Sequence, residues 1–335
     1  MELLTTLPLT EELLSQIRGV SPKLRVTHIP TRKAEDVPAE IWAKTEILFT
    51  STAVPGADQA FKLKWIQFSY AGIDRWVREP IFSKPGIRVT TVSGASAPQV
   101  AEYVVMMMLS LGHRLPALTS AQRKSEWNPD RWERFMPVEI RDTTVGIVGY
   151  GSIGRHVARL LRPFGATVLA TKQNAMNPAD DGYSVEGLGD PGGDFVHRLY
   201  PAEAVKSMLK LSDYIVVCVP LTPKTRGIVN AHVLSTVKPG AFVVDVSRGS
   251  VMEHSALVKA LQDGRLAGAA LDVFPEEPLP ANSPLWTMPN VIVTPHIADS
   301  SPHFYERATA LFTENLHRYM AGMSLYNQFD PQRGY

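Results

Sequence analysis

Cysteine is almost absent from this sequence. The single residue, Cys218, lies within the apolar run DYIVVCVPL, so no disulfide can form inside the chain. A chain without disulfides suits a reducing compartment, and we expect a cytoplasmic protein. The first residues, MELLTTLPLTEELLSQI, agree with this expectation, because they carry acids early and lack the basic segment that opens a signal peptide.

An excess of either charge is also missing. Lysine and arginine number 34 against 33 aspartates and glutamates, which leaves a net charge of +1. This balance creates no long-range field, so we expect neither nucleic acid nor a membrane surface as a partner. Long apolar runs are missing too, since the most apolar helical stretch, residues 100–115, is too short to span a bilayer and contains Glu102.

What the chain does contain is a repeated alternation of short apolar strands with helical stretches. Its 335 residues, 44% of them apolar, allow two domains with sizeable cores. Short strands rich in Val and Ile and bounded by Gly or Pro are typical of parallel sheets buried on both faces, and the alternation predicts a doubly wound α/β fold. The predicted strands are 24–29, 46–50, 63–68 and 87–92 in a first set, and 144–149, 167–171, 214–219, 241–246, 269–273 and 291–295 in a second.

A glycine motif follows the first strand of the second set. Gly149, Gly151 and Gly154 have the spacing G-x-G-x-x-G, between that strand and an amphipathic helix. This context predicts a dinucleotide site, because the glycines allow a tight turn, close approach of a pyrophosphate and close helix–strand packing. Free N–H groups at the start of the helix, from Ser152 and Ile153, would hold the phosphates. The alternative is a glycine turn that serves packing alone.

The next strand ends without the acid that many NAD sites place there. It ends in Thr171, Lys172 and Gln173, and no acid occurs before Asp180. A carboxylate would repel a 2′-phosphate, whereas Lys172 would attract it, so we expect NADPH to be preferred over NADH. The alternative is that Lys172 points into solvent and Thr171 or Gln173 holds the ribose, which would allow both cofactors. The following residues, 174–195, are rich in Gly, Pro, Asp and Asn and predict a long loop.

Three later segments place polar residues at or just beyond the ends of strands. They are VVDVSRGSV with Arg248, AALDVFPEEPLP with Asp272, Glu276 and Glu277, and VIVTPHIADS with His296. Ligands of open α/β sheets bind at that edge, so a cation, a carboxylate and an imidazole are expected in one cleft. Taken singly, each also suits a salt-bridged or solvated loop residue.

Together these segments resemble the D-isomer-specific 2-hydroxyacid dehydrogenase family. The similarity spans residues 100–298 and is weaker in LKWIQFSYAGIDRW, residues 63–76. The segments that carry it are VAEYVVMMML, TVGIVGYGSIGRHVARLLRPFGATV, VPLTPKTRGIVN, LSTVKPGAFVVDVSRGSV, LAGAALDVFPEEPLP and PLWTMPNVIVTPHIA. Two features depart from the family pattern: Asp299 stands where a small residue is usual, and the loop 174–195 is longer than in common members.

The resemblance implies catalytic roles for three residues and no metal. Arg248 would bind the carboxylate and carbonyl of a 2-keto acid, His296 would donate the proton, and Glu277 rather than Glu276 would orient the imidazole. Backbone N–H groups of Ala71 and Gly72 would also bind the substrate, and Asp272 would face the nicotinamide carboxamide. The cofactor site would comprise Gly149, Gly151, Ser152, Ile153, Gly154, Thr171, Lys172, Val219, Pro220, Thr225, Val246, Ser247, Asp272 and Ala298.

The resemblance also implies an architecture. A Rossmann dinucleotide-binding domain, 101–297, would be inserted into a flavodoxin-like substrate domain, 1–100 plus 298–335. Members are commonly homodimers, and the segment RKSEWNPDRWERF, 123–135, mixes Arg with Trp in the manner of an arm packed on a partner subunit.

The function implied by the resemblance is that of an NAD(P)-dependent oxidoreductase. It would reduce a small 2-keto acid such as glyoxylate or hydroxypyruvate to the D-2-hydroxy acid, with NADPH preferred. Two alternatives remain open: a dehydrogenase of another small anion, of the formate or phosphite type, and a dinucleotide-sensing scaffold similar to the family's transcriptional co-repressors.

Overall fold

The computed structural model describes residues 1–74, 76, 79–331 and 333–334. The chain folds into two compact units. One unit joins residues 1–96 to 301–335, and the other comprises residues 97–300. The prediction of two parallel-sheet α/β domains is confirmed, because every strand in either sheet pairs with its neighbours in parallel.

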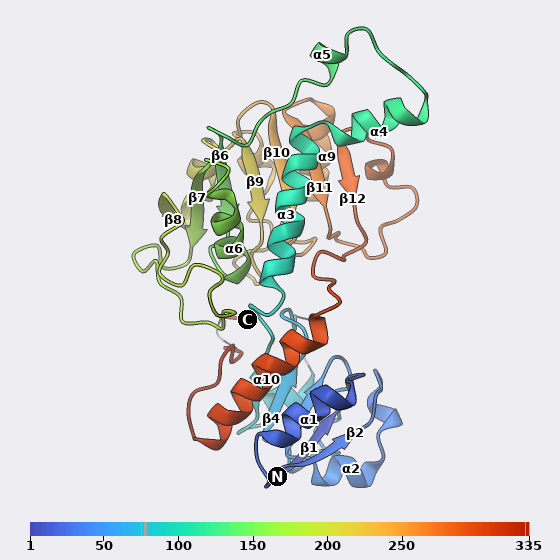
Figure 1. Ribbon diagram of the computed structural model, residues 1–335, viewed down its shortest axis with the longest axis vertical. Helices are drawn as coiled ribbons and strands as arrows, with labels where there is room; N and C mark the ends of the chain where they lie inside the picture. Colours follow the sequence, from blue (N-terminus) through green and yellow to red (C-terminus); the bar gives the residue numbers. More distant parts are fainter. Residues whose placement is uncertain (75, 77–78, 332, 335) are drawn as a thin grey trace. The chain divides into compact units, whose positions relative to one another are not determined.

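The first unit is built on a five-stranded sheet (Figure 1). Its strand order, β2-β1-β3-β4-β5, is the flavodoxin-like order. The strands are β1 (Glu2–Thr5), β2 (Arg25–His28), β3 (Ile47–Thr50), β4 (Trp65–Phe68) and β5 (Arg88–Thr90). The helices are α1 (Glu11–Gly19), η1 (Ala34–Asp36), α2 (Ala39–Lys44), η2 (Pro80–Ser83) and α10 (Phe304–Met320).

Alternating side chains of this sheet supply cores on both of its faces. Phe49 stacks on Phe312 of α10 with ring centroids 4.2 Å apart. The neighbouring residue Leu48 belongs instead to the cluster that contains Trp42 of α2. Helix α10 thus completes this unit with the C-terminal part of the chain, and its span agrees with the apolar periodicity of residues 304–319.

The second unit is built on a seven-stranded sheet of order β12-β11-β10-β9-β6-β7-β8. Counted from β6, this is the Rossmann order 3-2-1-4-5-6 with one further strand at the edge. The strands are β6 (Thr144–Val148), β7 (Thr167–Lys172), β8 (Arg198–Pro201), β9 (Tyr214–Val217), β10 (Ala241–Asp245), β11 (Leu266–Leu271) and β12 (Val291–Val293).

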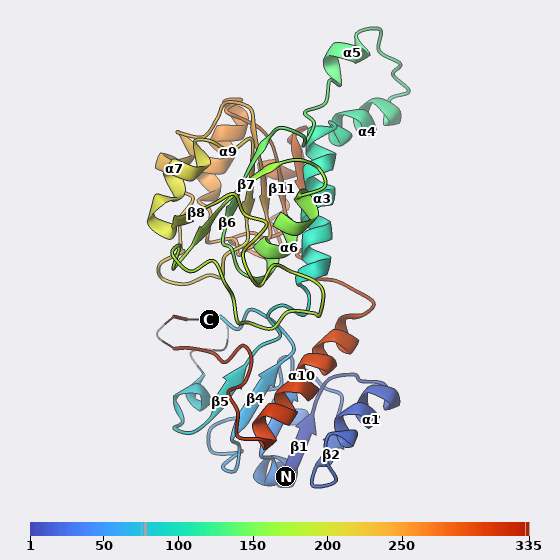
Figure 2. The ribbon, with the colours of Figure 1, turned by 60° about the vertical axis from the view of Figure 1, so that its left-hand side comes forward.

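Helices cover both faces of the seven-stranded sheet (Figure 2). α3 (Ala97–Gly112) and α6 (Ser152–Leu161) pack on one face. The other face carries α7 (Val205–Leu209), α8 (Ala231–Leu234) and α9 (His254–Gln262). The remaining helical segments are α4 (Leu115–Arg123), α5 (Arg131–Arg134), η3 (Ala202–Ala204) and η4 (Pro284–Trp286).

The segment between β7 and β8 has no regular secondary structure, as its composition predicts. The sequence patterns missed β8 itself and the N-terminal strand β1, which lies between β2 and β3. Among the described residues, no helix has the length and apolar character needed to cross a membrane.

Candidate functional site

The carboxyl edge of the seven-stranded sheet brings the predicted cofactor and catalytic residues of this unit to one side. The glycine turn follows β6, Lys172 ends β7, and Val219 and Pro220 come shortly after β9. Val246, Ser247 and Arg248 follow β10, Asp272 follows β11, and His296 lies three residues beyond β12. Because these strands are parallel and adjacent, their carboxyl ends lie at the same edge, where open α/β sheets bind ligands.

The glycine turn between β6 and α6 has the geometry of a phosphate cradle. Gly149 has φ +110°, a conformation that favours glycine, and a Cβ on Gly154 would lie 2.2 Å from the Gly149 carbonyl oxygen. Gly151 differs, because a Cβ there would meet no atom within 4 Å. It also gives α6 no side-chain cap, so the first N–H groups of the helix, including those of Ser152 and Ile153, remain suited to an anion.

Thr171 supports this turn from within the protein. Its hydroxyl accepts the N–H of Gly149 at 3.0 Å, and its carbonyl accepts the N–H of Tyr150 at 2.8 Å. The side chain is buried. Thr171 therefore fixes the turn in place, while its predicted contact with the ribose stays a prediction.

Lys172 contacts its own loop, an arrangement that neither sequence alternative described. Its ammonium donates to the carbonyl of Asn177 at 2.6 Å and to the carbonyl of Ala179. Burial, followed by the charge of Arg155, lowers the pKa of Lys172. An ammonium has three N–H donors, and these contacts use two of them.

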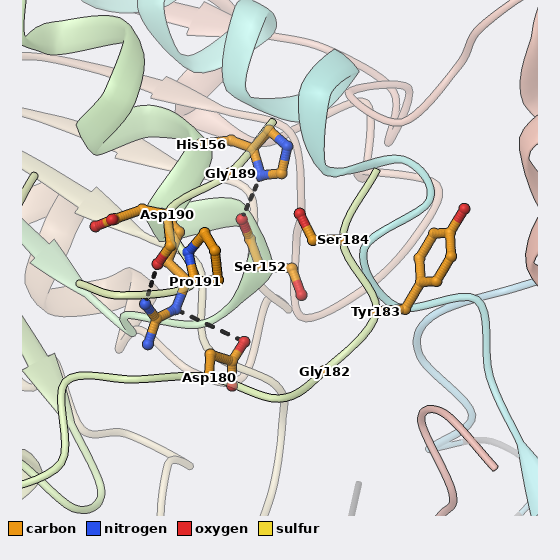
Figure 3. A pocket seen from close by; sticks show the side chains of 10 residues that line it. Ser152, His156, Asp180, Gly182, Tyr183, Ser184, Gly189, Asp190 and Pro191 are labelled. Atoms are coloured by element: carbon orange, nitrogen blue, oxygen red, sulfur yellow. Dashed lines mark hydrogen bonds and ion pairs between the residues drawn. The ribbon is translucent and has the colours of Figure 1, made fainter. Parts of the chain in front are cut away.

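The loop beyond Lys172 is held on helix α6 by Arg155. This buried guanidinium donates to the carbonyl of Pro178 at 2.6 Å. It also donates to the carbonyl of Asp190, and its Nε lies 3.6 Å from Asp180, two contacts marked by dashed lines in Figure 3. The carbonyls of residues 177 to 179 thus bind alternately to Lys172 and Arg155. These hydrogen bonds attach the loop segment to both β7 and α6, the two elements that flank the predicted adenosine end of the cofactor site.

A second anchor of the loop is the carboxylate of Asp190. It is buried, and it accepts the hydroxyl of Tyr150 and the N–H groups of Gly193, Asp194 and Phe195. The cavity left between the loop and α6 measures about 20 Å³. That volume holds about one water molecule, so this cavity is too small for an organic ligand.

The loop that carries Arg248 packs directly against the turn that carries Glu277. Gly249 permits this approach, because a Cβ there would lie 1.9 Å from the carbonyl carbon of Phe274. Arg248 Nη1 donates to the carbonyl of Ser247 at 2.8 Å, and the hydroxyl of Ser247 donates to Asp245 at 2.5 Å. The convergence of the guanidinium on the imidazole stays a prediction.

Asp245, at the end of β10, is a buried carboxyl group behind this loop. Its Oδ1 accepts the N–H and the hydroxyl of Ser247, whereas Oδ2 is buried without a hydrogen-bond partner. Burial raises the pKa of Asp245 to about 7, the bonds from Ser247 oppose the shift, and the charge of Asp272 adds to it.

His296 and Glu277 form a hydrogen-bonded pair at this edge. Nδ1 of His296 lies 2.9 Å from Oε2 of Glu277, and the other oxygen of the carboxylate accepts the N–H of Phe274 at 3.0 Å. A carboxylate only accepts, so Nδ1 carries the proton in this bond. The pair leaves Nε2 of the imidazole for chemistry, and Glu277, not Glu276, is the acid in contact.

Asp272 is buried beneath the segment that carries His296. Oδ1 accepts the hydroxyl of Thr294 at 2.7 Å and the N–H of Ile297 at 2.9 Å, and Oδ2 accepts the N–H of Ala298 at 2.9 Å. A carboxylate has about four acceptor positions, so one remains for the predicted nicotinamide contact.

The other predicted residues occupy loops at these edges. Thr225 closes the loop after β9, where its hydroxyl donates to the carbonyl of Pro220 at 2.6 Å. Ala71 and Gly72 follow β4 of the five-stranded sheet and so belong to the other unit.

Sequence patterns missed the residues that support the site from behind. These are Arg155, Asp190 and Thr294. Among them, only Arg155 could have been suspected from the sequence, because it directly follows Gly154, the third glycine of the cofactor turn. Among the described residues, no cluster of three or more His, Cys, Asp or Glu side chains could hold a metal ion.

Comparison with known proteins identifies the family. The model of the D-isomer specific 2-hydroxyacid dehydrogenase NAD-binding domain matches residues 105–298. The chain is 33% identical to a glyoxylate reductase of Thermofilum pendens, over 77% of this chain and 72% of that protein. It is 32% identical to a D-3-phosphoglycerate dehydrogenase of Methanocaldococcus jannaschii, over 79% of this chain but only 47% of that longer protein.

Solved structures agree over the whole chain. A D-isomer specific 2-hydroxyacid dehydrogenase from Xanthobacter autotrophicus Py2, in complex with NADPH and MES, has a TM-score of 0.80 and 29% identity. The match covers 99% of this chain and 100% of that one. An NADPH-dependent glyoxylate/hydroxypyruvate reductase from Sinorhizobium meliloti, in complex with NADP and sulfate, has a TM-score of 0.77 and 26% identity, covering 100% and 99%. The chain therefore belongs to the D-isomer specific 2-hydroxyacid dehydrogenase family of oxidoreductases.

Proposed function

We propose that this protein reduces a small 2-keto acid, of the glyoxylate or hydroxypyruvate type, to the D-2-hydroxy acid with NADPH. The observation that carries the proposal is the hydrogen bond between His296 and Glu277, on the sheet edge that also bears the glycine turn. An imidazole held by a carboxylate suits general acid–base work at a carbonyl.

The residues of the turn fit a dinucleotide. Gly151 faces open space, so the backbone there is accessible to a diphosphate, and α6 begins with N–H groups that no side chain caps. When bound, the reduced nicotinamide supplies the hydride. The protein then has to bind the substrate anion and to provide a proton.

His296 is suited to provide that proton. Its Nδ1 is held by Glu277, which orients the ring and leaves Nε2 to donate to the developing alkoxide. In our proposal Arg248 binds the carboxylate of the keto acid, because a planar guanidinium matches two oxygens at once. The backbone N–H groups of Ala71 and Gly72 stay predicted as further substrate-binding groups.

Preference for NADPH is supported by the end of β7. No acid stands there to repel a 2′-phosphate, and the ammonium of Lys172 has one N–H beyond the two that bind loop carbonyls. The structures from X. autotrophicus and S. meliloti contain NADPH and NADP, which favours the same cofactor here. The glyoxylate and hydroxypyruvate substrates are proposed by similarity to the S. meliloti enzyme.

The homodimer and the cytoplasmic location stay predictions. The segment of α4, α5 and their connection supports the homodimer, because Trp127 and Trp132 are exposed there. We propose that this segment is the arm that packs on a second copy of the chain.

Turnover of NADPH with glyoxylate and with hydroxypyruvate tests the proposed reaction. We expect oxidation of NADPH by the wild type and a loss of about 10² to 10⁴ in kcat for His296→Ala. His303→Ala is the matched control, because His303 is an exposed histidine paired with Glu306. A wild type without turnover on either substrate would overturn the proposal.

A further inference from the structure

The turn that carries His296 is held in an unusual backbone conformation. His296 has φ +53°, in the left-handed region that residues other than glycine rarely adopt. Its N–H bonds to the carbonyl of Thr294 at 3.1 Å, which closes a tight turn around Pro295. Such a conformation persists when the surroundings fix it, so the groups that hold the turn also set the position of the imidazole.

The carboxylate of Asp272 is the centre of this support. It lies below the turn, 1% exposed, and binds it through the hydroxyl of Thr294 and the N–H groups of Ile297 and Ala298. These contacts bracket His296 on both sides in the sequence. Any shift of the carboxylate or of Thr294 therefore moves the turn.

A further residue reaches this network from helix α3. The hydroxyl of Tyr103 lies 2.5 Å from the Thr294 hydroxyl oxygen. Thr294 gives its only proton to Asp272, so Tyr103 must be the donor to Thr294. Burial raises the pKa of Tyr103 to about 12, and the phenol therefore keeps that proton at working pH. The bonds form a directed chain from Tyr103 through Thr294 to Asp272.

We propose that Tyr103 is a positioning residue for His296. Tyr103 acts through Thr294 and Asp272 and touches neither substrate nor cofactor. The chain of hydrogen bonds fixes the hydroxyl of Thr294 on the carboxylate, and the carboxylate fixes the backbone on the far side of the imidazole. The effect on turnover rests on the proposed function, in which His296 supplies the proton. The effect on the conformation of the turn does not depend on the proposed function.

Tyr103→Phe tests the proposal with Tyr214→Phe as its matched control. Both tyrosines are buried in the same unit, and the hydroxyl of Tyr214 donates to the carbonyl of Val138 at 3.0 Å, away from the 294–298 turn. Loss of a single neutral hydrogen bond predicts a fall in kcat of about fivefold for Tyr103→Phe, with an unchanged Kd for NADPH. Tyr214→Phe is expected to keep the wild-type kcat.

A mutant cycle separates positioning from general stability. In a His296→Ala background there is no imidazole to position, so adding Tyr103→Phe should leave the residual turnover unchanged. The same fall in both backgrounds, or an equal fall in Tyr214→Phe, would show that the hydroxyl of Tyr103 has no specific link to His296.

Hydrogen exchange measures the turn without any substrate. The amides of Ile297 and Ala298 should exchange about fivefold faster in Tyr103→Phe than in the wild type and Tyr214→Phe. Unchanged exchange would overturn the proposal even if kcat fell. If the wild type turned over neither keto acid, the proposed function would fail, and the exchange rates would still decide whether Tyr103 supports the turn.

Discussion

Nδ1 of His296 lies 2.9 Å from Oε2 of Glu277, while the second oxygen of that carboxylate accepts the N–H of Phe274. Glu277 therefore links the imidazole to a backbone position that packs against the loop of Arg248. Glu277→Gln keeps the size of the side chain but replaces the carboxylate that accepts the Nδ1 proton of His296 by a neutral amide. We expect kcat for glyoxylate reduction to fall by about 10², measured from NADPH consumption at saturating cofactor.

The neighbouring acid provides the control for this prediction. Glu276 is exposed and directly precedes Glu277 in the chain. Glu276→Gln should retain the wild-type kcat. Equal losses in the two variants would mean that the local negative charge, and not the contact with His296, matters for turnover.

Lys172 is predicted to select the phosphorylated cofactor. Lys172→Met removes the N–H that we assign to the 2′-phosphate together with both bonds to the loop carbonyls. The loop bonds are the same whichever cofactor binds, so the ratio of kcat/KM for NADPH to that for NADH isolates the phosphate contact. A charged hydrogen bond predicts a fall in this ratio of about tenfold or more.

Lys210→Met controls for the loss of a positive charge on the same unit, because Lys210 is exposed and lies at the end of α7. It should leave the cofactor ratio unchanged. A constant ratio in Lys172→Met would assign this lysine to loop folding alone.

Much of the fold follows from short-range patterns. The helical spacing of apolar residues after Gly151 and after Phe304 matches α6 and α10, because each helix buries one face. The strand β1 escaped detection, since ELLT is followed directly by further apolar residues and an acidic helix start. Its place between β2 and β3 depends on pairing with distant strands, which local composition does not encode.

The sequence places the candidate residues at the carboxyl edge of the sheet through chain position alone. His296, Arg248 and Glu277 stand just beyond strand ends, and parallel strands bring such positions to one edge. The support behind them depends on contacts between distant residues, as between Tyr103 and Thr294. The bonds of Lys172 to carbonyls of its own loop could not be predicted from the sequence either. Every residue has the same backbone carbonyl, so the sequence does not indicate which of them a lysine binds.

Asp245 predicts a pH dependence of stability. Burial raises the pKa of Asp245 from its ordinary value of 3.8 to about 7, so the folded state keeps a proton that the unfolded chain releases. The folded state binds more protons between these values, and the free energy of unfolding therefore falls as the pH rises from about 4 to about 7. Asp245→Asn does not titrate. Urea unfolding should show this variant gaining stability relative to the wild type between pH 5 and pH 8, by at most about 3 kcal/mol.

The difference between variant and wild type cancels the other titrating groups. Asp263→Asn, at the exposed end of α9, serves as the control and should show the same difference from the wild type at both pH values. A constant difference for Asp245→Asn as well would mean that Asp245 is ionised in the folded protein throughout this range.

The segment from α4 to α5 predicts the oligomeric state. It extends away from the seven-stranded sheet (Figures 1 and 2) and carries Trp127 and Trp132, which are 86% and 71% exposed. Arg131 lies over the ring of Trp132, 5.1 Å from its centroid, and such Trp–Arg groups are typical anchors of protein interfaces.

Replacing both tryptophans by Ala should shift the protein from dimer to monomer in size-exclusion chromatography with light scattering. Trp286→Ala, at a 52% exposed tryptophan elsewhere on the same unit, should leave the dimer intact. A wild type that elutes as a monomer, or a double variant that stays dimeric, would exclude this arm as the subunit contact.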